Sequence, residues 1–160
     1  MAAFSDVIAG LEKAFNIQAA RNMTDNAVGL GLEDGSVVNV EHFPEGEALH
    51  VHYDLGGVPP DIRPVVLMSL MAVHTCGIVT QGCHFGFEPQ RESLLLFRSL
   101  PMRGAPAGTL VEMIGHFMGQ ALHWRAALPG LFEEAGRRAG GGGDGQASNP
   151  GNRDGTMIKG

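Results

Sequence analysis

The stretch of sequence that decides the fold is Ala48-Leu49-His50-Val51-His52-Tyr53-Asp54-Leu55. After Ala48, every odd-numbered residue in it is apolar and every even-numbered residue is polar. A period of two places these sets on opposite faces of a β-strand. Antiparallel sheets commonly pack one face on the core and leave the other in solvent, which gives this pattern. We therefore predict a half-buried antiparallel strand at residues 48–55.

Two more strand-like runs precede this stretch, at residues 27–32 and 37–42. Asp34-Gly35 separates them, and an Asp-Gly pair is a strong signal for a tight turn. The connection between residues 42 and 48 is also short. Such short links favour antiparallel neighbours, so the three runs predict a three-stranded meander.

Two helices are predicted around the meander. Phe4, Val7, Ile8, Leu11 and Phe15 recur at the spacing of one helical stripe, so a helix covers about residues 4–17. A second helix, at residues 62–75, is apolar around nearly its whole circumference. One sheet face can bury only half of such a helix. The other half needs another helix or another subunit.

The remaining elements complete an α+β pattern. A hairpin of strands at residues 83–87 and 94–100 follows Gly77, and a last helix is predicted at about residues 107–127, ended by Pro129-Gly130. The order is α-β-β-β-α-β-β-α. Strands in groups, without strand–helix alternation, predict a twisted antiparallel sheet flanked by helices.

Glycine and charge divide the chain into two unlike parts. Residues 136–160 hold 9 of the 24 glycines and only four apolar residues, so we predict a disordered tail there and a folded domain at residues 1–135. The formal net charge of -6 divides in the same way. The domain carries -8 and the tail +2.

The composition excludes several classes of protein. Acidic residues outnumber basic ones 17 to 11, which argues against a nucleic-acid binder and against a basic membrane-surface protein. We see no apolar run of membrane-spanning length and no signal peptide. The two cysteines make no disulfide framework, so we expect a reducing cytoplasm.

The histidines and cysteines invite a metal hypothesis. His50 and His52 share a strand face, and His74, Cys76 and Cys83 could cluster after the second helix. Their spacing lacks the tight pairs of a zinc site, so we expect no metal and no cofactor, with a small metal-binding protein as an alternative. No nucleophile elbow, phosphate loop or paired-carboxylate motif stands out. We therefore expect a protein that is not an enzyme.

The chain resembles a known family over about residues 4–128. The stretches that carry the resemblance are Leu32-Glu33-Asp34-Gly35-Ser36-Val37, Leu67-Met68-Ser69-Leu70-Met71, and Cys83-His84-Phe85-Gly86-Phe87-Glu88-Pro89-Gln90-Arg91-Glu92-Ser93-Leu94-Leu95-Leu96. In this order, and in a small acidic chain, they are similar to the class I type III secretion chaperones of the Tir-chaperone (CesT-like) family. The Gly-rich tail and the many histidines depart from that pattern.

The resemblance implies a virulence-associated homodimer in the bacterial cytoplasm, with no catalysis. It implies that the dimer binds the extended N-terminal segment of a secreted effector on apolar grooves and delivers it to the secretion ATPase. From the acidic composition we also expect no nucleic-acid or membrane partner. A protein-interaction adaptor that is not a chaperone is the alternative.

The apolar patterns supply the residues for this hypothesis. For the dimer interface we predict Val66, Leu70, Val73 and Phe85. For effector binding we predict apolar residues of the first helix and of the sheet: Phe4, Ile8, Leu11, Val38, Val40 and Leu96.

Overall fold

The computed structural model describes residues 3–17, 19–21 and 26–140. Its elements are α1 (Phe4–Phe15), β1 (Ala19–Arg21), β2 (Ala27–Gly31), β3 (Val37–Phe43), η1 (Pro44–Gly46), β4 (Ala48–Gly57), α2 (Arg63–His74), η2 (Thr75–Gly77), β5 (His84–Glu88), β6 (Ser93–Pro101) and α3 (Ala107–Gly140). The predicted α+β order is confirmed. Strand β1 was not predicted; it pairs with β2 and extends the meander at its start.

The strands form one six-stranded antiparallel sheet in the order β1-β2-β3-β4-β6-β5. β4 lies near its centre, where Val51 pairs with Val40 of β3 and with Arg98 of β6. The alternation that predicted this strand is confirmed, because the side chains of Leu49, Val51 and Tyr53 are buried. The β4–β6 register shifts between Asp54 and Gly56, which marks a bulge near the end of β4.

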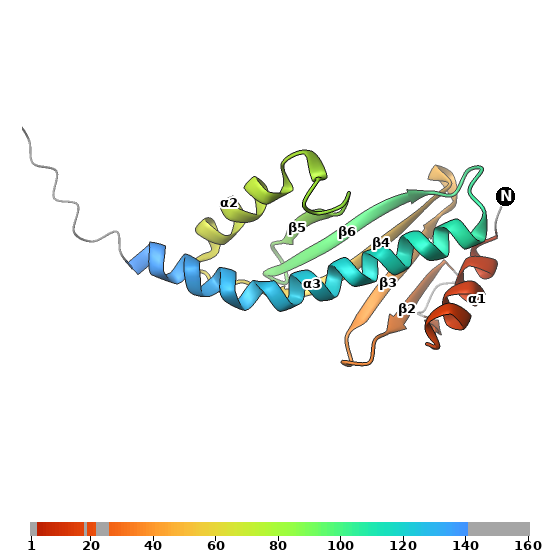
Figure 1. Ribbon diagram of the computed structural model, residues 1–160, viewed down its shortest axis with the longest axis horizontal. Coiled ribbons are helices and arrows are strands. Elements are labelled where there is room, and N and C mark those ends of the chain that lie inside the picture. The colour runs from red at the N-terminus through yellow and green to blue at the C-terminus, as the bar shows by residue number, and fades with distance from the viewer. Residues whose placement is uncertain (1–2, 18, 22–25, 141–160) are drawn as a thin grey trace, which may run out of the picture.

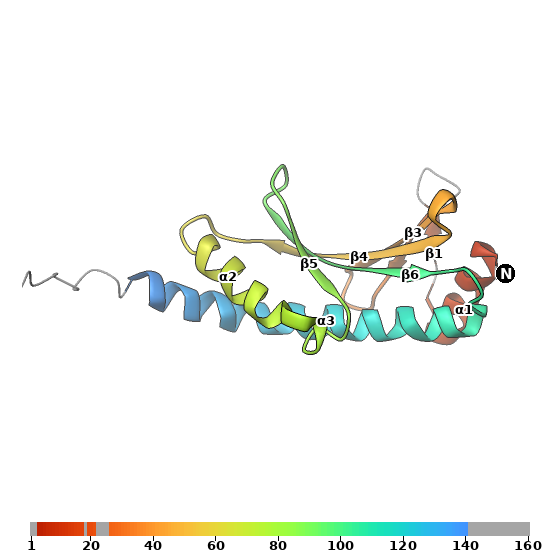
Figure 2. The same cartoon turned by 90° about the horizontal axis from the view of Figure 1, so that it is seen from above.

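All three α-helices lie on one side of the sheet (Figures 1 and 2). α3 runs along the sheet and contacts α1, β4, β6 and α2. The core lies between these layers and holds five fully buried side chains: Leu30, Leu96, Leu110, Ile114 and Phe117. The opposite face of β3, β4 and β6 carries no α-helix among the described residues (Figure 2).

Helix α2 packs against α3 and β5 rather than across the sheet. Its residues Val66 and Leu70 point into the core and are at most 2% exposed. Met68 and Met71, on the other side of the same helix, are each 71% exposed. Another helix therefore covers one half of α2, and the other half stays open in the single chain.

The predicted end of the last helix is wrong. α3 continues through Pro129 to Gly140, although a proline inside a helix removes one backbone hydrogen bond and costs about 3 kcal/mol. Burial beyond the proline offsets this cost. Ala135 is only 2% exposed, and Leu131 and Phe132 pack partly against the core.

Helix α3 crosses the predicted domain boundary at residue 135 and reaches Gly140. The division into a folded domain at residues 1–135 and a disordered tail at residues 136–160 stays a prediction. The rest of the predicted disordered tail, residues 141–160, lies outside the described residues. None of the helices among the described residues is long and apolar enough to cross a membrane.

Candidate functional site

Most of the predicted effector-binding residues lie in the core of the single chain. Ile8, Leu11, Val38, Val40 and Leu96 are all at most 9% exposed. Phe4 is half-buried and stacks on His42, with ring centroids 5.5 Å apart. In the single chain the five buried residues therefore form no surface groove, and the role of the set in effector binding stays a prediction. The apolar stripe of α1 and the inward residues of β3 and β6 belong instead to one buried core, in which α1 contacts α3.

The predicted dimer residues divide into two pairs. Val66 and Leu70 are buried within the chain, so in this structure they offer no surface to a second copy. Val73 and Phe85 are half-buried. Phe85 packs edge-on against Trp124 of α3, with ring centroids 4.9 Å apart. The predicted helix therefore has an open face, but its exposed residues differ from the predicted ones.

We give the name α2 surface to the exposed large apolar side chains of α2 and of the segment that follows η2: Met68, Met71, Ile78 and Val79. Ile78 and Val79 follow η2 and are 79% and 58% exposed. Beside it, a cleft of about 440 Å³ lies between α2 and the last turns of α3, lined by Met68, Val73 and Leu131 among others. Large exposed apolar side chains that gather in one region mark a site of protein interaction.

Three exposed apolar side chains also lie on the helix-free side of the sheet, and we call this side the open sheet face: Val37, Phe43 and Phe97. The strand registers place these side chains on the face opposite the core. The Phe97 ring packs at a tilt against the His84 ring, with the ring centroids 5.4 Å apart. A Cβ added at Gly86 would lie 3.2 Å from the Phe97 ring, so the glycine lets the aromatic ring lie across the neighbouring strand.

The residues of the metal hypothesis come only partly together. Nδ1 of His84 lies 3.3 Å from Nε2 of His74. Cys76 is exposed, whereas Cys83 is buried, and burial raises the pKa of the Cys83 thiol. Throughout the part of the chain that the structure describes, no three His, Cys, Asp or Glu side chains group so that they could hold a metal ion.

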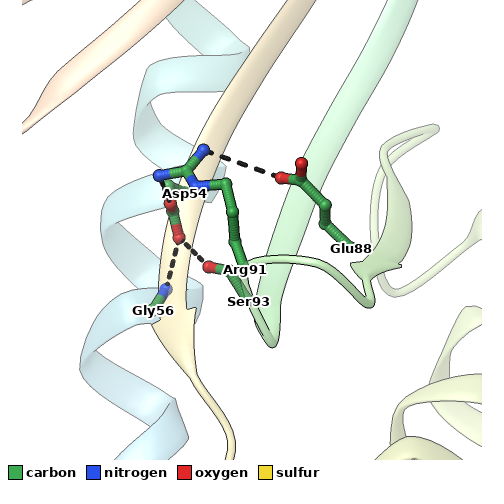
Figure 3. Close-up of polar contacts among 5 residues, drawn as sticks. All are labelled: Asp54, Gly56, Glu88, Arg91 and Ser93. Atoms are coloured by element: carbon green, nitrogen blue, oxygen red, sulfur yellow. Dashed lines mark hydrogen bonds and ion pairs between the residues drawn. The ribbon is translucent and has the colours of Figure 1, made fainter.

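A polar cleft of about 470 Å³ lies at the end of β4, and no sequence pattern predicts it. Figure 3 shows its Asp54 side. Asp54 accepts hydrogen bonds from the Gly56 N–H at 2.8 Å, from Nη2 of Arg91 at 2.9 Å and from the Ser93 hydroxyl. Nη1 of Arg91 also lies 3.6 Å from the Glu88 carboxylate.

The other side of the polar cleft repeats this arrangement. Asp34, in the β2–β3 turn, accepts hydrogen bonds from the N–H and the hydroxyl of Ser36 and from Nη1 of Arg125. The same Nη1 donates to the Tyr53 hydroxyl at 3.0 Å. The Ser36 hydrogen bonds lower the pKa of Asp34. The hydrogen bond to Tyr53 raises the pKa of Arg125, with a further contribution from Asp34.

A comparison with protein families decides what kind of molecule carries these surfaces. The model of the Tir chaperone protein (CesT) family matches residues 6–125. The chain belongs to the Tir chaperone protein family. The match ends within α3, so the last turns of this helix lie beyond the part that the family shares. No curated protein matches the sequence.

Solved structures share the fold of this Tir chaperone family member. The chain is similar to a chain of the HopA1–SchA chaperone–effector complex, with a TM-score of 0.56 and 12% identity over 83% of this chain and 99% of that one. It is also similar to a chain of the ExoU–SpcU complex from the type III secretion system of Pseudomonas aeruginosa. The TM-score is 0.59 and the identity is 14%, over 79% of this chain and 98% of that one. A third similar chain comes from the complex of the Yersinia pestis type III secretion chaperone SycH with a fragment of YscM2. Here the TM-score is 0.57 and the identity is 11%, over 76% of this chain and 98% of that one.

Proposed function

We propose that this Tir chaperone family member is a cytoplasmic type III secretion chaperone. It acts as a homodimer, binds the extended N-terminal segment of a secreted effector and presents that segment to the secretion ATPase. It works by binding rather than by catalysis. The observation that carries the proposal is the pair of exposed apolar surfaces on a chain whose family match covers residues 6–125.

The α2 surface suits the second copy of the chain. Met68 and Met71 leave most of their apolar area in solvent, although they lie on a helix whose inner residues are fully packed. Obligate dimer interfaces resemble a divided hydrophobic core and usually bury about 2,000 Å² or more. Val73 and Phe85, half-buried at the edge of the same region, stay in the proposed interface. Val66 and Leu70 support it from inside.

The open sheet face suits the effector segment. Val37, Phe43 and Phe97 are 38–45% exposed and lie on three sheet positions rather than in one deep pocket. An extended polypeptide places alternate side chains on one side, so it can insert several apolar side chains along such a face. A disordered segment loses entropy when it is ordered, and a wide contact area compensates for this loss.

Two measurements test the proposal. Light scattering on the purified full chain is expected to give the mass of a dimer at micromolar concentration. Co-expression with N-terminal segments of secreted proteins from the same bacterium is expected to give a soluble complex in which the segment's NMR spectrum shows no independent fold. A monomer that binds only folded partners would support an adaptor and contradict the chaperone function.

A further inference from the structure

The polar cleft has the geometry of a ligand site, and neither apolar surface needs it. Its volume of about 470 Å³ lies in the range of small-ligand sites, and its walls bring together polar groups from the β2–β3 turn, β4, the β5–β6 hairpin and α3. Its two sides repeat one motif, a carboxylate held by a serine, by a backbone N–H and by an arginine.

The acceptors of the polar cleft are already occupied. Oδ1 of Asp54 takes the Gly56 N–H and the Ser93 hydroxyl, and Oδ2 takes Arg91. Asp34 is occupied in the same way by Ser36 and Arg125. A cation that entered the cleft would therefore have to displace an arginine from a carboxylate that also has two other donors.

The donors of the polar cleft are not all used. Arg125 donates only through Nη1, so Nε and Nη2 have no hydrogen-bond acceptor among the described residues. Nε of Arg91 also has no acceptor among the described residues, since the contacts of this side chain use Nη1 and Nη2. Tyr53 also lines the cleft, but it is 1% exposed and its oxygen accepts from Arg125, so the unused donors lie on the two arginines. The cleft therefore has free N–H donors, and these can bind a hydrogen-bond acceptor of a ligand.

The backbone around the polar cleft leaves room for a polypeptide. The β3–β4 ladder ends at the pair Val38–Tyr53, whereas β4 continues to Gly57. A Cβ added at Gly56 or Gly35 would meet no atom within 4 Å, so no side chain fills the space beside either glycine. An extended segment can approach this end of β4 without displacing a side chain from these positions.

We propose that the polar cleft binds the carboxylate of a Glu or Asp side chain carried by the extended segment, through the free N–H groups of Arg125 and Arg91. This inference rests on the proposed function, because the segment is the molecule that brings the side chain. Asp34 and Asp54 orient the two guanidinium groups, which leaves their free N–H groups for a charge-assisted hydrogen bond. The domain carries -8, so long-range attraction does not favour an acidic ligand, and the selectivity comes from direct contacts.

The test uses the full chain, labelled for NMR, and short Gly-Ser peptides that carry a single Glu, Gln or Lys. The Glu peptide is expected to shift the Arg125 and Arg91 Nε–H signals and to bind about tenfold more tightly than the Gln peptide, the ratio typical of one hydrogen bond to a charged group. Arg125→Gln and, as a second variant on a more exposed side chain, Arg91→Gln should each abolish this preference. Arg103→Gln is the matched control, because Arg103 pairs with Glu47 outside the cleft and should leave the preference unchanged.

Three results would overturn the inference: equal binding of the Glu and Gln peptides, tighter binding of the Lys peptide, or a preference that survives both cleft variants. Inorganic phosphate is a further probe. If it shifts the same signals as strongly as the Glu peptide, the cleft is a general anion site and the inference also fails. A chain that forms a dimer and captures effector segments without a Glu preference refutes only the inference. A monomer that captures no segment refutes the proposed function, whatever the cleft binds.

Discussion

Substitution of Met68 by Ala separates the proposed dimer interface from the core of the same helix. Full burial of a methionine side chain stabilises by roughly 1.5–3 kcal/mol. Met68 is 71% exposed in the single chain, so burial at an interface still offers about 1–2 kcal/mol. A two-fold dimer contains the substitution twice, so Met68→Ala should weaken dimerisation by about 2–4 kcal/mol, or roughly 30- to 700-fold in Kd.

The assay is sedimentation or light scattering over a dilution series, with urea unfolding of each variant as a second measurement. Since Met68 is a surface residue of the single chain, its substitution should change the stability of the monomer by no more than about 0.5 kcal/mol. Val37→Ala, on the open sheet face, is the control and should leave the dimer unchanged. A Met68→Ala chain that dissociates at the same concentration as the unsubstituted chain would refute the interface.

Four further outcomes follow from single positions. Leu70→Ala, at a side chain 2% exposed, should lower the free energy of unfolding by about 2–5 kcal/mol in urea, and a smaller loss would show that the site is loosely packed. Phe97→Ser should weaken capture of an effector segment at least severalfold in a pull-down, measured at a temperature at which the variant is folded; unchanged capture would remove the open sheet face from the proposal. Asp34 has a lowered pKa, so its contribution to stability is present above about pH 4 and is lost as the pH falls further. The difference in melting temperature between the unsubstituted chain and Asp34→Asn should therefore shrink as the pH falls below about 4. A difference that stays constant with pH would contradict this. Pro129→Ala should raise the free energy of unfolding by up to about 3 kcal/mol, and with it the melting temperature, because it restores a hydrogen bond inside α3. A lower melting temperature would show that the packing of the proline ring stabilises the helix.

The order of elements and the inward face of the sheet were predictable, because both follow from local period. The alternation in residues 48–55 predicts which side chains of β4 are buried, and Asp34-Gly35 predicts the first hairpin. β1 was missed because three residues are too few to show a period. The end of α3 was missed because packing after Pro129 outweighs a local penalty, and a local signal contains no information on that packing.

The candidate site was less predictable, for a related reason. A period shows that a helix or strand has an apolar face, but it does not show which part of that face another element covers. The sequence indicated that α2 needs partners on two sides, yet the structure decides that Leu70 faces inward and Met68 outward. The polar cleft gathers Asp34, Arg91 and Arg125 from three distant parts of the chain, and no short motif marks such a cluster.

Because α3 is longer than the sheet, its last turns can show by hydrogen exchange whether a partner has moved α2. At about 1.5 Å per residue its 34 residues span about 51 Å, whereas the 10 residues of β4 span about 33 Å. The final turns therefore overhang the sheet beside α2, as Figure 1 shows, and Ala135 is buried there. Pro129 interrupts the hydrogen-bond ladder at the base of the overhang. Any partner that shifts α2 should therefore change how fast the backbone amides after Pro129 exchange with deuterium, and so be detectable far from the bound effector.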